Sequence, residues 1–285
     1  MAFQSIEQIL EKMEQTGLDM AMVVMEEDCR ECMLSPEVSR KKMEAMWDTM
    51  VQASREYDAG QVSQSGLVGT DGGKMEKYVQ QQKNYTGDFV GNVVAEALKM
   101  GENNACMKRI VAAPTAGSCG VIPSVLLVSY RQFAFPVSKM VDSLYVAAGI
   151  GQVIGHRASL AGASGGCQAE VGAAAAMAAG ALVYLRDGSG RQIADGIAMA
   201  LKNMLGLVCD PVAGLVEVPC VKRNVAGAMN AISAADMALA GISSRIPVDQ
   251  VIDAMREIGD DMDPKYKETA CGGCAATPWA KEWKM

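Results

Sequence analysis

The sequence has few aromatic residues, one histidine and no excess of positive charge. Only 5% of its 285 residues are aromatic, so the core must be built from aliphatic side chains, alanine and 21 methionines. The formal net charge of −7 leaves no basic surplus to neutralise phosphates, which argues against a nucleic-acid partner. A chain of this length buries roughly three quarters of its unfolded surface and needs no disulfide bonds for stability.

The sequence also lacks the pattern of a secretory leader and an uninterrupted membrane span. Residues 1–17 carry charges from Glu7 onward and contain no apolar central region. Residues 110–130 are uncharged over the length of a spanning helix, but Pro114, Gly117 and Pro123 break them into a loop followed by a helix. We therefore expect a cytoplasmic protein without membrane contact, whose nine cysteines stay reduced.

Apolar residues recur with helical spacing along most of the chain. Ser5 is expected to cap a first helix that ends at Gly17, and Pro36 to open a second helix with Val38, Met43, Met46, Trp47 and Met50 inward. Further helices are expected around residues 88–101, 170–186, 193–205, 224–240 and 247–258. Neither strand alternation nor a repeat is visible. The sequence predicts one all-α domain over residues 1–285, with N-terminal helices at 1–60 and a binding core at 61–285.

Three cysteines lie in irregular segments at predicted helix boundaries. Cys167 follows two glycines in GASGGCQAEVG, Cys209 precedes Asp-Pro, and Cys220 follows Pro219. Glycine lets a ligand approach the backbone closely, and proline stiffens a turn. Three thiolates on rigid turns can converge and leave one corner of a 4Fe–4S cluster open. Scattered core thiols are the alternative that the pattern alone leaves.

The remaining cysteines offer a rival pattern. Cys29 with Cys32 and Cys271 with Cys274 are two C-x-x-C pairs, which together suggest a closed zinc site. However, 239 residues separate the pairs, far more than in local zinc motifs. A redox role for CGGC stays open, and Cys106 and Cys119 default to core or loop positions.

A few other polar residues invite a functional interpretation. His156, the single histidine, is either a hydrogen-bonded structural residue or a catalytic base. Arg157, Lys222 and Arg223 either recognise a carboxylate or lie on the solvated surface. Lys74, in a glycine-containing loop, superficially resembles a pyridoxal phosphate lysine, but the loop lacks the rest of a phosphate site.

Four long motifs closely resemble the α chain of iron–sulfur-dependent L-serine dehydratase, also called L-serine ammonia-lyase. They are APTAGSCGVIPSVLL, GASGGCQAEVGAAAAMAAGAL, GLVCDPVAGLVEVPCVKRN and YKETACGGCAATP, and the resemblance extends from about residue 65 to the C-terminus. The resemblance implies that Cys167, Cys209 and Cys220 hold a 4Fe–4S cluster, and that the enzyme converts L-serine to pyruvate and ammonium in amino-acid catabolism and gluconeogenesis.

If L-serine is the substrate, the protein needs a site that binds its carboxylate group. The PTAGSCG loop offers backbone N–H groups, hydroxyls and a helix start, which together suit an anion. The predicted substrate-binding residues are Ser65, Gly66, Thr115, Ala116, Gly117, Ser118 and Ser164. His156 is the candidate base, unless a partner chain supplies one.

The chain also departs from single-chain members of this family. It has no histidine shortly before the CDP cysteine, and it ends in PWAKEWKM, without a terminal cysteine. A second module with a serine- and histidine-containing motif is missing, so the resemblance implies a β-chain partner. The alternatives are a related lyase such as L-cysteine desulfidase, or a non-catalytic helical subunit that binds zinc.

Overall fold

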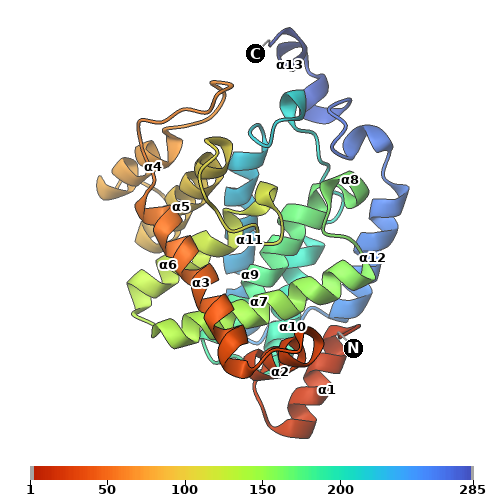
Figure 1. Cartoon of the computed structure of the whole chain (residues 1–285). Helices are drawn as coiled ribbons and strands as arrows, with labels where there is room; N and C mark the ends of the chain where they lie inside the picture. The colour runs from red at the N-terminus through yellow and green to blue at the C-terminus, as the bar shows by residue number, and fades with distance from the viewer. Residues whose placement is uncertain (1–2, 284–285) are drawn as a thin grey trace.

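An alanine-rich helix, α9 (Ala173–Leu185), runs through the centre of the protein (Figure 1). The structure is a computed structural model that describes residues 3–283. Four helices pack directly against α9: α6 (Val121–Phe133), α7 (Val137–Arg157), α10 (Gly190–Lys202) and α11 (Cys220–Leu239). Within the described residues there are only isolated β-bridges and no strand, which confirms the predicted all-α fold.

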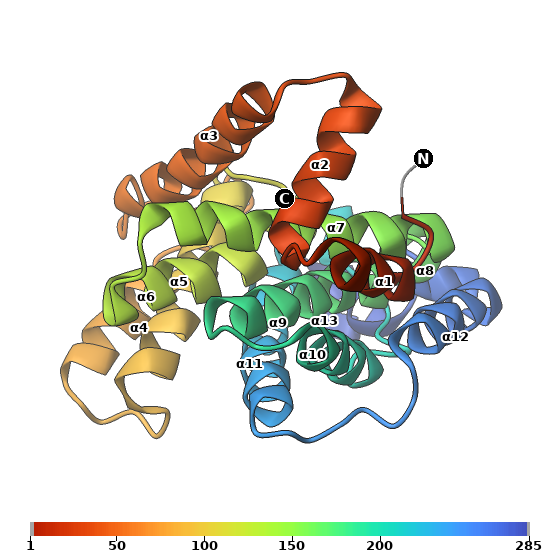
Figure 2. The same ribbon diagram turned by 90° about the horizontal axis from the view of Figure 1, so that it is seen from below.

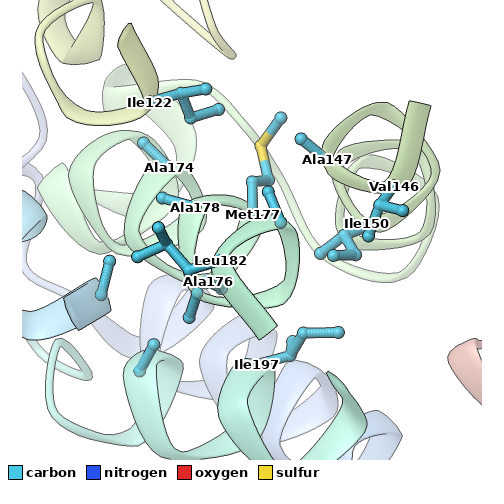
Figure 3. Packing of buried hydrophobic residues seen from close by; sticks show 14 of the residues in the cluster. Ile122, Val146, Ala147, Ile150, Ala174, Ala176, Met177, Ala178, Leu182 and Ile197 are labelled. Carbon is cyan, nitrogen blue, oxygen red and sulfur yellow. The ribbon is translucent and has the colours of Figure 1, made fainter. Parts of the chain in front are cut away.

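Small residues let the central helices approach one another closely. A Cβ atom added at Gly180 of α9 would lie 2.3 Å from Cδ1 of Ile150 on α7, so only glycine fits there without movement. Figure 3 shows Ile150 and Ala147 of α7 beside Met177 of α9, with Ile197 of α10 lower in the view. Residues 168–185 are apolar enough to span a membrane, but 89% of this stretch is buried within the fold. Its composition is therefore that of a core helix.

Helices at the two ends of the chain pack outside this centre. Helices α2 (Met20–Cys32) and α3 (Pro36–Arg55) pack against α7, and α1 (Ile6–Thr16) packs against α2, α10 and α12 (Val248–Asp261) (Figure 2). Helices α4 (Asp71–Gln80) and α5 (Gly87–Ala105) pack together beside α6 and α11. Helix α12 packs on α10, and the chain then continues through short turns to α13 (Pro278–Glu282).

The sequence located most of these helices and missed four. Ser5 caps α1 and Gly17 ends it, as expected, and α6 begins only after the proline- and glycine-rich loop. Helices α2, α4, α7 and the short α13 were not predicted; the glycine-containing loop expected before residue 84 gives way to α4 at Asp71. On α3, Trp47, Met50 and part of Met43 face inward, but Val38 and Met46 are largely exposed, so that part of the prediction is wrong. Helix α3 packs against α2, α5, α6 and α7, and Val38 and Met46 lie on the part of its surface that these helices leave uncovered.

Because Ile150 of α7 packs closely against Gly180 of α9, Ile150→Ala is expected to lower the free energy of unfolding by about 2–5 kcal/mol. Ile150 is fully buried, and its removal leaves a cavity that the flanking alanines cannot fill. The change is measured by urea denaturation. Ile246→Ala, at a site that is 49% exposed, serves as the control and should cost less than about 0.5 kcal/mol.

Candidate active site

The three cysteines singled out by the sequence lie on three different turns and are all buried. Cys167 follows the single-turn helix α8 (Gly162–Gly165) and precedes a π-helical turn, η2 (Gln168–Gly172), that leads into α9. Cys209 lies between α10 and the turn η3 (Val212–Gly214), and Cys220 is the first residue of α11. Each is at most 9% exposed.

These thiols are close enough to influence one another's ionisation. Burial raises the pKa of Cys167 to about 11 and that of Cys220 to about 12. The pKa of Cys209 is also raised, first by burial and then by the negative charges of Glu170 and of thiolates at Cys167 and Cys220. Arg223 acts in the opposite direction on the pKa of Cys167. The fold therefore brings three buried thiols into one neighbourhood, with a single guanidinium beside them.

The donor set fits a cluster better than a single metal ion. Among residues 3–283, no three His, Cys, Asp or Glu side chains converge tightly enough to hold one ion. An iron–sulfur cube separates its thiolate ligands across different corners, so it does not require the sulfurs to meet at one point. The backbone of Gly162 also lies close to one of these thiols, because a Cβ added at Gly162 would lie 3.0 Å from Sγ of Cys209. Three buried thiols with glycine beside them fit the implied 4Fe–4S cluster.

The zinc alternative fails on the fold. Cys29 and Cys32 lie in the last turn of α2 at one end of the molecule, whereas Cys271 and Cys274 lie on the C-terminal segment at the other (Figure 1). Four ligands of one zinc ion must lie within a few ångströms of one another. The two C-x-x-C pairs therefore cannot form a common zinc site. Cys119 is a core residue, as its pattern suggested.

Glu170, which the sequence analysis did not single out, lies between the cysteines and the PTAGSCG loop. Its Oε2 is 3.8 Å from Sγ of Cys209, and its carboxylate is hydrogen-bonded by Thr115. Burial raises its pKa, and the negative charge of Glu268 adds to this shift, while the hydrogen bonds from Thr115 and Cys209 oppose it. Glu170 belongs to the π-helical turn η2, an irregularity that is frequent at functional sites. Its only signal in the sequence was its place in GGCQAEVG.

The PTAGSCG loop is fixed to the start of α11 by one side chain, that of Asn224. Its Nδ2 donates to the carbonyl oxygens of Gly117 (2.9 Å) and Cys220 (3.0 Å), and its Oδ1 accepts from the N–H of Gly120 (2.8 Å). Asn224 is 1% exposed, so these bonds are shielded from water. A predicted cluster ligand and the predicted anion cradle are thus joined through a buried amide. The motif VPCVKRN contains Asn224, but nothing local in the sequence indicates its partners.

Within the loop, the predicted substrate-binding residues differ in how free they are. Ser118 is fully buried, and its hydroxyl contacts Thr115 in a capping box of the turn η1 (Ala116–Ser118). Ala116 is exposed, and Thr115 and Gly117 are half-buried beside Glu170. The hydroxyl of Ser118 is therefore used inside the loop, whereas Thr115 to Gly117 line its outer side.

The segment that contains SGLVG, residues 65–69, is hydrogen-bonded to a carboxylate near Cys220. The hydroxyls of Ser63 (2.9 Å) and Ser65 both donate to Oε2 of Glu217, which is 7% exposed. Glu217 lies three residues before Cys220. The predicted residue Ser65 is thus anchored near a predicted ligand, and Gly66 is exposed with a φ of +76°.

The C-terminal segment is fastened directly to the Cys209 turn. The N–H of Cys209 donates to the carbonyl of Tyr266 (2.8 Å), and the N–H of Glu268 donates to the carbonyl of Cys209 (2.8 Å). The buried carboxylate of Asp210 accepts from Arg223 (2.6 Å) and from the N–H of Cys274 (2.6 Å). The tail after α12 therefore lies against the candidate site, a point that the sequence left open.

The other candidate side chains are exposed or paired with other groups. His156 is exposed in the last turn of α7, and Ser164 is exposed on α8. Arg157 pairs with Asp253 of α12 (2.6 Å), and Lys222, 70% exposed, with Asp71 (3.4 Å). The three basic residues therefore do not form one cluster, and only Arg223 contacts the site. Lys74 is bound to Asp71 and is also exposed.

Comparisons with known proteins agree with this arrangement of motifs. The family model described as serine dehydratase alpha chain matches residues 15–275. The probable L-serine dehydratase alpha chain of Bacillus subtilis (strain 168) is 43% identical over 280 residues, which cover 98% of this chain and 93% of that protein. The L-serine dehydratase alpha chain of Peptoniphilus asaccharolyticus is 38% identical over 271 residues, covering 95% and 93%.

A longer relative shows the same similarity over part of its length. L-serine dehydratase TdcG of Escherichia coli (strain K12) is 45% identical over 182 residues, which are 63% of this chain but 40% of that protein. The similarity to the two alpha chains, by contrast, extends over nearly the whole of both partners. The chain is therefore a member of the serine dehydratase alpha chain family, an L-serine dehydratase alpha chain, as its motifs predicted.

Proposed function

We propose that this chain, together with a β chain, eliminates water from L-serine at a 4Fe–4S cluster held by Cys167, Cys209 and Cys220. The observation that carries the proposal is the meeting of three buried thiols, from three separate turns, beside a glycine-rich loop. Bound there, the cluster would supply an iron with a free coordination position, which acts as a Lewis acid on the serine hydroxyl.

The chain's own residues would bind and orient the substrate. The N–H groups and hydroxyl of the loop from Thr115 to Gly117 suit the substrate carboxylate, and Asn224 holds this loop in register with Cys220. Arg223 lies beside Cys167 and favours the thiolate form that iron ligation requires. A base takes the α-proton as hydroxide leaves from the β-carbon; His156 or a group of the β chain fills this role. The resulting 2-aminoacrylate tautomerises and is hydrolysed to pyruvate and ammonium.

Two observations support a β-chain partner. The two relatives that match over 93% of their length are named alpha chains, and the L-serine dehydratase TdcG is more than twice as long as the matched segment. We expect this chain to act in the cytoplasm as one half of a heteromer.

The proposal is tested by the visible spectrum of anaerobically purified protein, with counts of iron and acid-labile sulfide. We expect a brown protein that forms pyruvate from L-serine in the presence of its β chain, and that loses both colour and activity in air. Full L-serine turnover by colourless, iron-free protein would disprove the proposal. Faster turnover of L-cysteine, with release of sulfide, would instead identify an L-cysteine desulfidase.

A further inference from the structure

Glu170 is a carboxylate without a cationic partner at the centre of the candidate site. Among the described residues, the groups that act on its ionisation are Thr115, Cys209 and Glu268, and none of these carries a positive charge. Arg223, the guanidinium nearest the cysteines, is bound to Asp210 instead. Placing a carboxylate in a partly buried site is costly unless a cation or hydrogen bonds compensate it. A positively charged group of a ligand would therefore stabilise the Glu170 carboxylate.

The backbone of two glycines lies directly against this carboxylate. A Cβ at Gly162 would lie 2.7 Å from Oε2 of Glu170, and a Cβ at Gly117 would lie 3.3 Å from Oε1. Side chains at these positions would press on the carboxylate from two sides. Glu170 itself is half-buried, so part of it is reachable from solvent. A small ligand can therefore reach the carboxylate only on the side that these two loops leave exposed.

The neighbours of Glu170 match the remaining parts of an amino-acid substrate. On one side is Cys209, a proposed cluster ligand near which the substrate hydroxyl would bind, and on the other is Thr115 of the proposed carboxylate cradle. The one group of L-serine that these two sites leave unbound is its α-ammonium. A carboxylate that lacks a cation and lies between the other two sites complements that group.

We infer that Glu170 binds the α-ammonium group of the substrate and thereby makes the site selective for α-amino acids over hydroxy acids. This inference rests on the proposed function, because it takes L-serine as the ligand. Glu170 is a specificity-determining residue in this scheme, and the hydroxyl and carboxylate of the substrate bind elsewhere.

The test compares L-serine with 3-hydroxypropionate, which keeps the carboxylate and the β-hydroxyl but lacks the ammonium group. In Glu170→Gln, assembled anaerobically with its β chain, we expect the KM for L-serine to rise about 10- to 100-fold, the effect of losing a charged hydrogen bond. The dissociation constant of 3-hydroxypropionate, measured by calorimetry, should stay the same or fall. Iron and sulfide contents should match those of the wild type.

Two further variants make the test decisive. Glu268→Gln removes the same charge from an exposed position nearby and should change the KM for L-serine less than about 3-fold. Glu170→Asp keeps the charge on a shorter side chain and should also weaken L-serine selectively. Equal weakening of both ligands in Glu170→Gln, an unchanged KM, or loss of iron from both Glu170 variants would overturn the inference. Wild-type protein that holds no iron and does not turn over L-serine would disprove the proposed function itself.

Discussion

Cys209→Ser is expected to lose both the cluster and L-serine turnover, with activity falling more than about 100-fold. A serine hydroxyl is a poor substitute for a thiolate as an iron ligand, and even changes in residues that only support a metal ligand typically cost 10- to 100-fold. Cys209 is buried beside Cys167 and Cys220. Cys29 and Cys32 lie in the last turn of α2, at the other end of the molecule, and cannot replace it as a ligand. The measurement is iron and acid-labile sulfide per chain, alongside pyruvate formation.

Cys106→Ser is the matched control for this change. Cys106 is only partly buried at the end of α5, and burial together with Glu102 accounts for its raised pKa. Its replacement should leave iron content and turnover within about 2-fold of the wild type. If the two variants retained equal iron, Cys209 would not be a ligand. The ligand set would then have to be sought among other thiols, such as Cys274.

Asn224→Leu is expected to lower kcat/KM for L-serine by about 100-fold, because a small misplacement of reacting groups has an effect of this size. Leucine has a similar volume but leaves three backbone groups, the buried ones of Gly120 and Cys220 and the half-buried one of Gly117, without their hydrogen-bond partner. Each such group costs about 1–3 kcal/mol, so the loop and the first turn of α11 should move apart. Steady-state kinetics and iron content measure the two consequences.

Asn230→Leu separates this effect from a general loss of helix packing. Asn230 lies on the same helix and donates to the carbonyl of Ala200 (2.7 Å), away from the candidate site. Its replacement should lower stability and leave the KM unchanged. Asn224→Asp, which still accepts from Gly120 but cannot donate, should give an intermediate kcat/KM. Normal kinetics in Asn224→Leu would show that the loop holds its position without this side chain.

The sequence predicted the all-α class correctly because helix caps and helix-breaking residues act on their immediate neighbours in the chain. Ser5 and Gly17 cap α1 as their residue types predict, and prolines and glycines delay α6 until residue 121. Helix α7 escaped notice because almost all of its middle is buried, so it lacks the alternation of polar and apolar faces that marks a surface helix. Val38 and Met46 were wrongly expected to be buried. The apolar periodicity of a helix indicates which face is turned inward, but not how much of that face the neighbouring helices cover.

The sequence by itself determined the α-helical class, the cluster-binding motif as a hypothesis, and membership in the serine dehydratase alpha chain family, since each depends on residue types in order. Only the tertiary structure placed Asn224 between the loop at residue 117 and Cys220, and Glu170 beside Cys209 without a cation. It also separated the two C-x-x-C pairs and brought the C-terminal segment to Asp210. Contacts across 39 to 107 residues depend on how helices pack, and no local pattern encodes that packing.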